Sequence, residues 1–266
     1  MHIVIRHSKT LTMKKNLLTF SYALLFISSF GQIETKPLFE KGVNYYKKGN
    51  YKSAVKEFSA VLEKATDTIV KKFAFIYRGL AKNELGEFTS AITDFDMAIE
   101  LDPDDLRTYI DRGRSKIYAG NDEAAIADLK FVLARDSINK QGQSAIFFLA
   151  SIAYDAGEFG LSIKYYDKLI LLTPEDFELY FNRGVAKGMI MDREGSIKDY
   201  DKAIKLNPQY KEAYANRGVA KINVLSTKGN IRPTKEQTKD ACTDLKKAKK
   251  LGDNTVDDMI FIHCGK

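Results

Sequence analysis

Few residues of this chain are of types that do chemistry, and they lie near its carboxyl end. After the amino-terminal apolar stretch there are one histidine, His263, and two cysteines, Cys242 and Cys264. These would supply three zinc ligands with no obvious fourth, whereas structural zinc sites use four. The sequence offers no Ser/His/Asp set, no phosphate-binding glycine loop and no metalloprotease histidine pair. We therefore expect no catalytic residue, no cofactor and no metal site, and hence no enzyme.

Most of the chain consists of a motif that recurs every 34 residues. Gly79 to Gly113 spans one period of 34 residues, and Gly184 to Gly218 spans another. Two copies, 35–68 and 143–176, match the motif less closely. The six copies are 35–68, 72–105, 106–139, 143–176, 177–210 and 211–251, the last with an insertion at 225–235.

Within each copy, numbered from position 1, small and apolar residues recur together, as in two short helices that cross closely. Position 8 holds Gly42, Gly79, Gly113, Ala150, Gly184 and Gly218; position 24 holds Phe58, Phe95, Leu129, Tyr166, Tyr200 and Leu245; position 32 holds Pro103, Pro174 and Pro208. This pattern resembles the tetratricopeptide repeat (TPR) family. The segment 241–248, Ala-Cys-Thr-Asp-Leu-Lys-Lys-Ala, also resembles exported repeat proteins of Bacteroidota-type bacteria.

The resemblance implies an all-α fold. We expect a right-handed superhelical solenoid of about six helix pairs over 35–251, closed by a capping helix in 252–266. One helix pair cannot bury its own apolar face, so neighbouring repeats must stack into a continuous core. In the family, the first helices line a concave face.

A regular set of charges accompanies the repeats. Four copies carry Arg at position 7, Lys at position 11 and Asp at position 23, whereas repeat four lacks all three. One interpretation is a basic ladder for an anionic ligand. The other, which we favour, is that each Arg pairs with the Asp of its own repeat, which predicts contacts of Arg112 with Asp128 and of Arg183 with Asp199.

The resemblance also implies a binding surface, because positions 2, 5, 9, 12 and 13 line the groove in the family, and Asn182 and Asn216 at position 6 could bond a peptide backbone. We call the following residues the groove set: Phe39, Tyr46, Ile76, Leu80, Ile110, Arg114, Tyr118, Phe147, Tyr154, Phe181, Asn182, Val185 and Asn216. About half of the groove positions are equally well explained by packing against neighbouring helices. The Lys/Asn clamp with which some members hold a C-terminal carboxylate is not matched, since position 5 is never Lys and position 9 never Asn.

The amino-terminal segment 1–31 reads as an extension followed by a signal peptide. Met13, the probable start, opens a short basic region, and an apolar stretch leads to small residues before Gln32. We therefore expect a secreted or periplasmic protein that meets the membrane only through a transient signal peptide. An uncleaved anchor is the alternative.

The overall charge gives little reason to expect nucleic acid as a partner. The formal net charge is +7, but segment 1–31 holds four of the 42 basic residues and none of the 35 acidic ones. The rest of the chain is nearly balanced. The function we expect is an exported scaffold that binds a peptide or helix of a protein partner in its groove. An accessory module of an envelope enzyme or glycan-processing assembly is the alternative.

Export would place the two cysteines in an oxidising compartment, where a disulfide is favoured. Cys242 lies ten residues before Gly252, and Cys264 lies ten residues after Asn254. If the helices that carry the two cysteines fold back on each other at the turn 252–254, the cysteines lie side by side. We therefore expect a Cys242–Cys264 disulfide that fastens the capping helix; two buried free thiols are the alternative.

Overall fold

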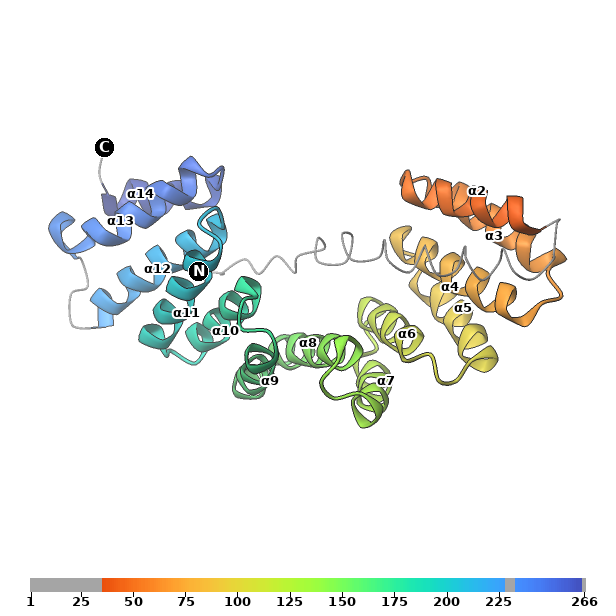
Figure 1. Ribbon diagram of the computed structural model, residues 1–266. Coiled ribbons are helices and arrows are strands. Elements are labelled where there is room, and N and C mark those ends of the chain that lie inside the picture. Colours follow the sequence, from red (N-terminus) through yellow and green to blue (C-terminus); the bar gives the residue numbers. More distant parts are fainter. Residues whose placement is uncertain (1–34, 228–232, 265–266) are drawn as a thin grey trace. The chain divides into compact units, whose positions relative to one another are not determined.

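The computed structural model describes residues 35–227 and 233–264, and this part of the chain is helical, with no strand (Figure 1). The all-α prediction is confirmed. The expected signal peptide in 1–31 lies outside the described residues. Within the described residues, no helix is long and apolar enough to span a membrane.

The chain divides into two compact units, Met1–Ala145 and Ile146–Lys266, and the boundary falls within helix α8. The first unit contains α2 (Thr35–Lys47), α3 (Tyr51–Lys64), α4 (Thr68–Glu84), α5 (Phe88–Leu101), α6 (Leu106–Tyr118) and α7 (Asp122–Arg135). Helix α8 (Lys140–Asp155) crosses the boundary. The second unit contains α9 (Phe159–Leu172), α10 (Phe177–Met189), α11 (Arg193–Leu206), α12 (Lys211–Thr227), α13 (Lys235–Lys250), the 3₁₀ helix η1 (Asn254–Val256) and α14 (Asp257–Cys264).

Within each unit, consecutive helices pack side by side, as Figure 1 shows for α4 with α5 and for α10 with α11. The first helix of a pair ends where the backbone turns into the left-handed region. Gly86 has φ 79° after α4, and Met191 has φ 64° at the corresponding place after α10. Glycine adopts this conformation without strain because it lacks a Cβ atom, whereas methionine does not.

The two helices of a pair are held close by the contact between positions 8 and 24. A Cβ atom added to Gly184 would lie 2.8 Å from the ring of Tyr200, which is only 2% exposed. At Gly113 the facing residue is Leu129, and the added Cβ atom would lie at an ordinary 3.5 Å. The room left at position 8 therefore differs from one repeat to another.

This difference predicts opposite effects for the same substitution. Gly184→Ala should destabilise the second unit by about 1–3 kcal/mol, because the buried Tyr200 ring cannot move away from the new methyl group. Gly113→Ala, the matched control, should be neutral or stabilise by up to about 1 kcal/mol, since alanine favours helix and has room here. Urea unfolding followed by circular dichroism measures both. Equal destabilisation by the two variants would contradict this account of the packing.

The carboxyl end consists of α12, α13, η1 and α14. Helix α12 continues to Thr227, into the segment 225–235 expected as an insertion, and α13 begins with a capping box between Thr234 and Gln237. Helix α14 packs against α13, and Val256 and Met259 are buried in the core that the two share. The hydroxyl of Thr238 in α13 donates to the carbonyl of His263 at 3.0 Å.

The expected disulfide is present. Cys242 of α13 is bonded to Cys264 of α14, with a Cα–Cα distance of 5.5 Å. Cys242 is 6% exposed, and Cys264 packs against the same apolar cluster as Met259. The chain folds back at Gly252, so the two cysteines lie opposite each other. The sequence predicted this because each cysteine is ten residues away from the turn.

Candidate functional site

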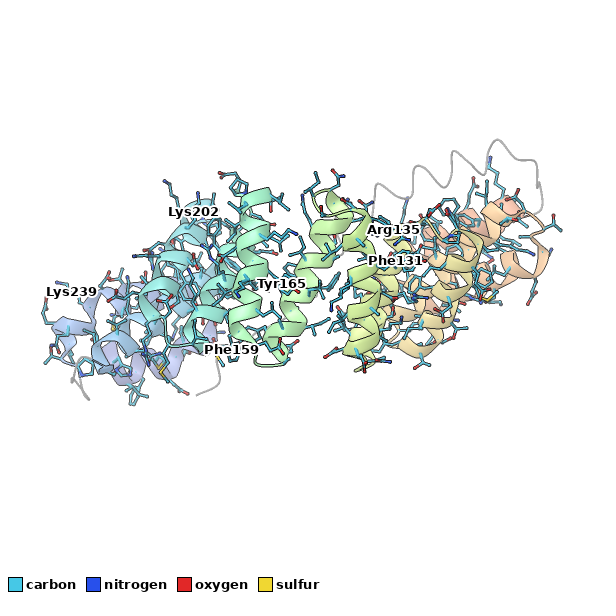
Figure 2. The ribbon with its side chains drawn as sticks, turned by 90° about the horizontal axis from the view of Figure 1, so that it is seen from below. Phe131, Arg135, Phe159, Tyr165, Lys202 and Lys239 are labelled. Atoms are coloured by element: carbon cyan, nitrogen blue, oxygen red, sulfur yellow. A yellow bond between two sulfur atoms is a disulfide. The ribbon has the colours of Figure 1, made fainter. Side chains whose placement is uncertain are left out.

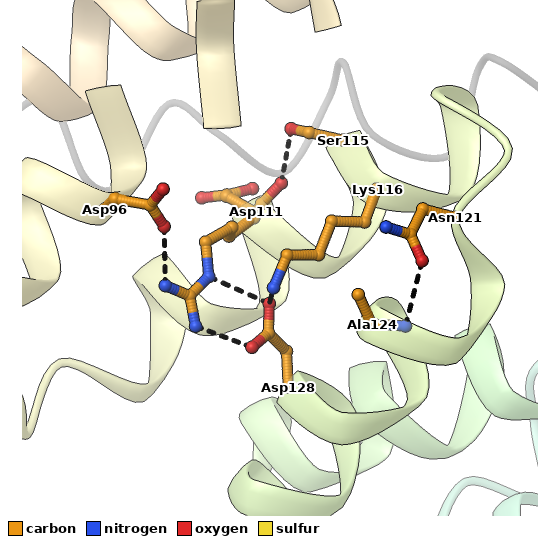
Figure 3. A network of polar contacts seen from close by, with 8 residues as sticks. Asp96, Asp111, Ser115, Lys116, Asn121, Ala124 and Asp128 are labelled. Carbon is orange, nitrogen blue, oxygen red and sulfur yellow. Dashed lines mark hydrogen bonds and ion pairs between the residues drawn. The ribbon is translucent and has the colours of Figure 1, made fainter. Parts of the chain in front are cut away.

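The regular charges form an ion-pair network between the two helices of a repeat (Figure 3). In the third repeat, Arg112 donates from Nε and Nη2 to the two carboxylate oxygens of Asp128, at 2.9 and 2.6 Å. Lys116 donates to the same carboxylate at 2.7 Å. Asp128 is 5% exposed, so the three short contacts compensate a charge that is removed from water.

The same arrangement recurs in three other repeats. Arg183 donates to Asp199 at 2.9 and 2.5 Å, and Lys187 lies 2.8 Å from it. The remaining members are Arg78 and Lys82 on Asp94, and Arg217 and Lys221 on Asp244. The predicted pairing of each Arg with the Asp of its own repeat is confirmed.

Each of these arginines also binds the preceding repeat, a contact that the sequence analysis missed. Nη1 of Arg112 donates to Asp96 at 2.7 Å, and Nη1 of Arg183 donates to Asp167 at 2.7 Å. Both acceptors lie 16 residues before the arginine, at position 25 of the preceding repeat. The sequence did carry a signal. The fourth repeat has Leu149 in place of the arginine, and the repeat before it has Lys130 instead of an acceptor at position 25.

Every guanidinium nitrogen of the four arginines donates a hydrogen bond in this network. Burial opposes the charge of Arg183, but the hydrogen bonds that it donates to Asp199 and Asp167 outweigh this effect and raise the pKa of the guanidinium. The same balance raises the pKa of Arg112 and of Arg217. Because each of their guanidinium nitrogens already donates a hydrogen bond, the arginines act as internal links between helices and repeats. The structure thus favours pairing over the alternative of a ladder for an anionic ligand.

The groove set contains buried residues as well as partly exposed ones. Phe39, Leu80, Ile110, Arg114 and Val185 are buried, with exposed fractions of 0, 6, 5, 5 and 3%. Phe39, for example, lies edge-on to the rings of Phe58 and Tyr77, with centroids 5.4 and 5.5 Å away. These side chains pack the interior, and the aliphatic and aromatic ones among them offer a partner no surface.

The tyrosines of the groove set are at least partly exposed, and they share a recurring contact. Each lies at the end of a first helix and packs against an aromatic residue that opens a second helix. Tyr46 packs on Tyr51 and Tyr154 on Phe159 within one repeat, with centroids 5.4 and 5.1 Å apart, whereas Tyr118 packs on Phe88 of the preceding repeat at 5.3 Å. We call these the edge pairs. Tyr118 is 47% exposed, so a partner could reach its ring.

The other members of the groove set are half-buried. Phe181 packs against Tyr200 and Tyr210, with centroids 5.8 and 4.9 Å away, and Phe147 lies 6.3 Å from Tyr166. Burial, followed by nearby carboxylates, raises the pKa of Tyr210. Ile76 packs on the edge of the apolar core of the first unit. These residues therefore contribute to packing as well as to the surface.

The two asparagines of the groove set differ. The amide of Asn216 donates to the carbonyl of Glu212 in its own helix at 3.0 Å. Asn182 is half-buried and makes no hydrogen bond with another described residue. Asn182 thus keeps its amide group for the backbone or side chain of a partner.

The second helices carry different surface chemistry. At the end of α7, the guanidinium of Arg135 lies over the ring of Phe131, 3.6 Å from its centroid (Figure 2). In the described part of the chain, no three His, Cys, Asp or Glu side chains are grouped as metal ligands would be. The two cysteines are both taken up by the disulfide.

Comparisons with known proteins agree with this architecture. A family model described as tetratricopeptide repeat matches residues 39–105 and 110–177, together just over half of the chain. A tetratricopeptide repeat protein from Parabacteroides merdae is 19% identical, with a TM-score of 0.61, over 90% of this chain and 88% of that one. The C-terminal part of a TPR repeat-containing protein from Cytophaga hutchinsonii is 18% identical, with a TM-score of 0.66, over 84% of this chain and 83% of that one.

A crystal structure of MamA is similar too, at 22% identity and a TM-score of 0.55, over 67% of this chain and 96% of that one. At these identities, the structural similarities establish the fold. The match to the family model, together with the recurring helix pairs, establishes the family: the chain belongs to the tetratricopeptide repeat family.

Proposed function

We propose that this chain is an exported scaffold for protein–protein interactions that binds a peptide or a helix of its partner on the first helices of its repeats. Domains of the TPR family bind proteins or peptides and generally act as scaffolds rather than enzymes. Export is supported by the signal-like pattern of 1–31 and by the disulfide, which suits an oxidising compartment.

The observation that carries this proposal is the edge pairs. Exposed tyrosines are unusually effective in binding, because a large, rigid ring buries much apolar area at little cost in conformational entropy while its hydroxyl remains available for hydrogen bonds. Here the rings are held in place by a second aromatic residue, so they are already ordered before a partner arrives. The free amide of Asn182 adds a polar contact in the second unit.

A test uses the full chain, immobilised and screened against a displayed library of random peptides. Peptides selected in this way should bind Tyr118→Ala about tenfold more weakly than the unaltered chain, the effect of losing a tyrosine that is central to an interface. Isothermal titration measures the affinity. Leu171→Ala is the matched control, since Leu171 is 83% exposed on the second helix α9 and should not matter.

Two results would count against the proposal. One is that selected peptides bind equally well after Tyr118→Ala, Tyr46→Ala and Tyr154→Ala. The other is that the library yields no peptide while a glycan array binds the chain, which would favour the accessory module of a glycan-processing assembly. Thermal unfolding of each variant, followed by circular dichroism, separates lost contacts from lost structure.

A further inference from the structure

Arg114 is unlike every other basic residue of the described chain, because it is buried. It lies in the second half of α6, at position 9 of its repeat, and its side chain is 7% exposed. Among residues 35–227 and 233–264, no other Arg or Lys is buried to this degree. Taking a guanidinium out of water is costly unless acceptors replace the lost hydration, so the acceptors around Arg114 decide its role.

Those acceptors are few. Nη2 of Arg114 lies 3.5 Å from Oδ1 of Asp111, longer than the 2.7–2.9 Å usual for a charge-assisted hydrogen bond. Asp111 is also shared, since Nε of Arg107 donates to its other oxygen at 3.2 Å. Arg112, two residues away on the same helix, instead makes three hydrogen bonds of 2.6–2.9 Å to two carboxylates. Arg114 therefore keeps most of its donors unused.

The unused donors of Arg114 can be reached from outside. No side-chain nitrogen or oxygen of the described residues is both fully buried and without a hydrogen-bond partner. The guanidinium nitrogens that lack an acceptor must therefore touch solvent, although the side chain as a whole is almost covered. The small exposed part of Arg114 is thus the part that donates hydrogen bonds.

Arg114 acts electrostatically on an edge pair of the first unit. Burial raises the pKa of Tyr46, the carboxylates of Glu84 and Asp111 raise it further, and the guanidinium of Arg114 opposes them. The ring of Tyr46 is held by Tyr51.

The unused donors of Arg114 suit an anion. Its contact with Asp111 is long, at 3.5 Å, and the other oxygen of Asp111 accepts from Arg107. Glu84, which also acts on Tyr46, is exposed on α4, where water screens its charge. A buried guanidinium with free, parallel N–H groups matches the two oxygens of a carboxylate better than any other group that a peptide offers.

We propose that Arg114 binds a carboxylate of the partner peptide, so that the first unit selects acidic ligands. The inference rests on the proposed function, since it names the chemistry of a peptide on the same surface. The carboxylate belongs to an Asp or Glu side chain or to the carboxyl terminus. This arrangement differs from a Lys/Asn clamp, because a single buried arginine in contact with Asp111 supplies the donors.

The test starts from peptides selected on the immobilised full chain from a random displayed library. Each is resynthesised with single Asp→Asn or Glu→Gln changes, and with its carboxyl terminus free or amidated. One of these changes should weaken binding to the unaltered chain about tenfold or more, as expected for a hydrogen bond between charged groups. A side-chain change identifies Asp or Glu as the source, and amidation identifies the terminus.

Variants then assign this effect to Arg114. In Arg114→Gln the same peptide change should alter affinity less than about twofold, because the donor pair is gone. In Arg114→Lys, removing the peptide carboxylate should still cause part of the loss of affinity. In Arg135→Gln, the same change of charge on α7 of the same unit, it should cause the full loss. If Arg114→Gln fails to fold, Arg114→Lys and the peptide changes on the unaltered chain still decide.

The outcomes separate this inference from the proposed function. Peptides that bind without sensitivity to any carboxylate, or with equal sensitivity in Arg114→Gln, would overturn the role of Arg114 and leave the scaffold function standing. Failure of the chain to bind any peptide would overturn the scaffold function, and the role of Arg114 with it.

Discussion

Asp199→Ala is expected to lower the free energy of unfolding of the second unit by about 3–5 kcal/mol, the cost of removing one partner from a buried ion pair. Asp199 is 4% exposed and accepts hydrogen bonds from Arg183 at 2.9 and 2.5 Å. Lys187 lies 2.8 Å from it. Without the carboxylate, two cations remain together in a largely desolvated space between α10 and α11. Since both keep some access to water, the lower end of this range is the more realistic value.

Asp201 provides a matched control on the same helix. Its side chain is 53% exposed, and its contact is a single ion pair with Arg217 of the next repeat, at 2.6 Å. Asp201→Ala should therefore cost less than about 1 kcal/mol, as exposed ion pairs generally do. Urea unfolding of the full chain measures both. Similar losses for the two variants would show that burial does not set the energy of these pairs.

A double variant tests the role of the network further. Arg183→Met combined with Asp199→Leu replaces the pair by apolar side chains of comparable size, and it should recover most of the stability lost in Asp199→Ala. A recovery would indicate that these pairs specify how the helices fit together more than they add stability. A loss larger than in Asp199→Ala would mean that the pair itself is strongly stabilising.

The second large effect concerns the disulfide between Cys242 and Cys264. Replacing both cysteines by alanine should destabilise the carboxyl-terminal hairpin by about 3 kcal/mol, because the bond closes a loop of about 20 residues and so restricts the unfolded chain. The bonded residues are 22 apart in sequence. Helix α14 has only 8 residues, and Met259 is its buried anchor, so it depends strongly on the bond.

Hydrogen exchange gives the clearest measurement, since loss of the bond should expose the amides of α14 well before those of α10 and α11. Reducing the unaltered protein is the control, because it breaks the bond while leaving the sulfur atoms in place. Thiol titration of denatured protein from an oxidising compartment should find no free thiol. Two reactive thiols per chain would contradict the disulfide.

The local architecture of each repeat could be predicted from the sequence. The 34-residue period predicted the helix pairs, because each pair is built from neighbouring residues whose apolar spacing fixes which faces meet. The pairing of Arg112 with Asp128 and of Arg183 with Asp199 could be predicted for the same reason, since both members lie on one hairpin of helices. The level placement of Cys242 and Cys264 likewise followed from the lengths of two adjoining helices.

The contacts between neighbouring repeats, in contrast, emerged from the three-dimensional structure. The second acceptor of Arg112, Asp96, belongs to the preceding repeat, and neither the 34-residue period nor the helical spacing orients it. The burial of Leu80 and Arg114 was also beyond the sequence, since the exposure of a first-helix residue depends on the helices that cover it from adjacent repeats. Position 9 holds Leu80 in one repeat and Arg114 in the next, and both are buried. Covering leucine removes apolar surface from water, whereas covering arginine leaves hydrogen-bond donors without acceptors, and this physical difference sets Arg114 apart.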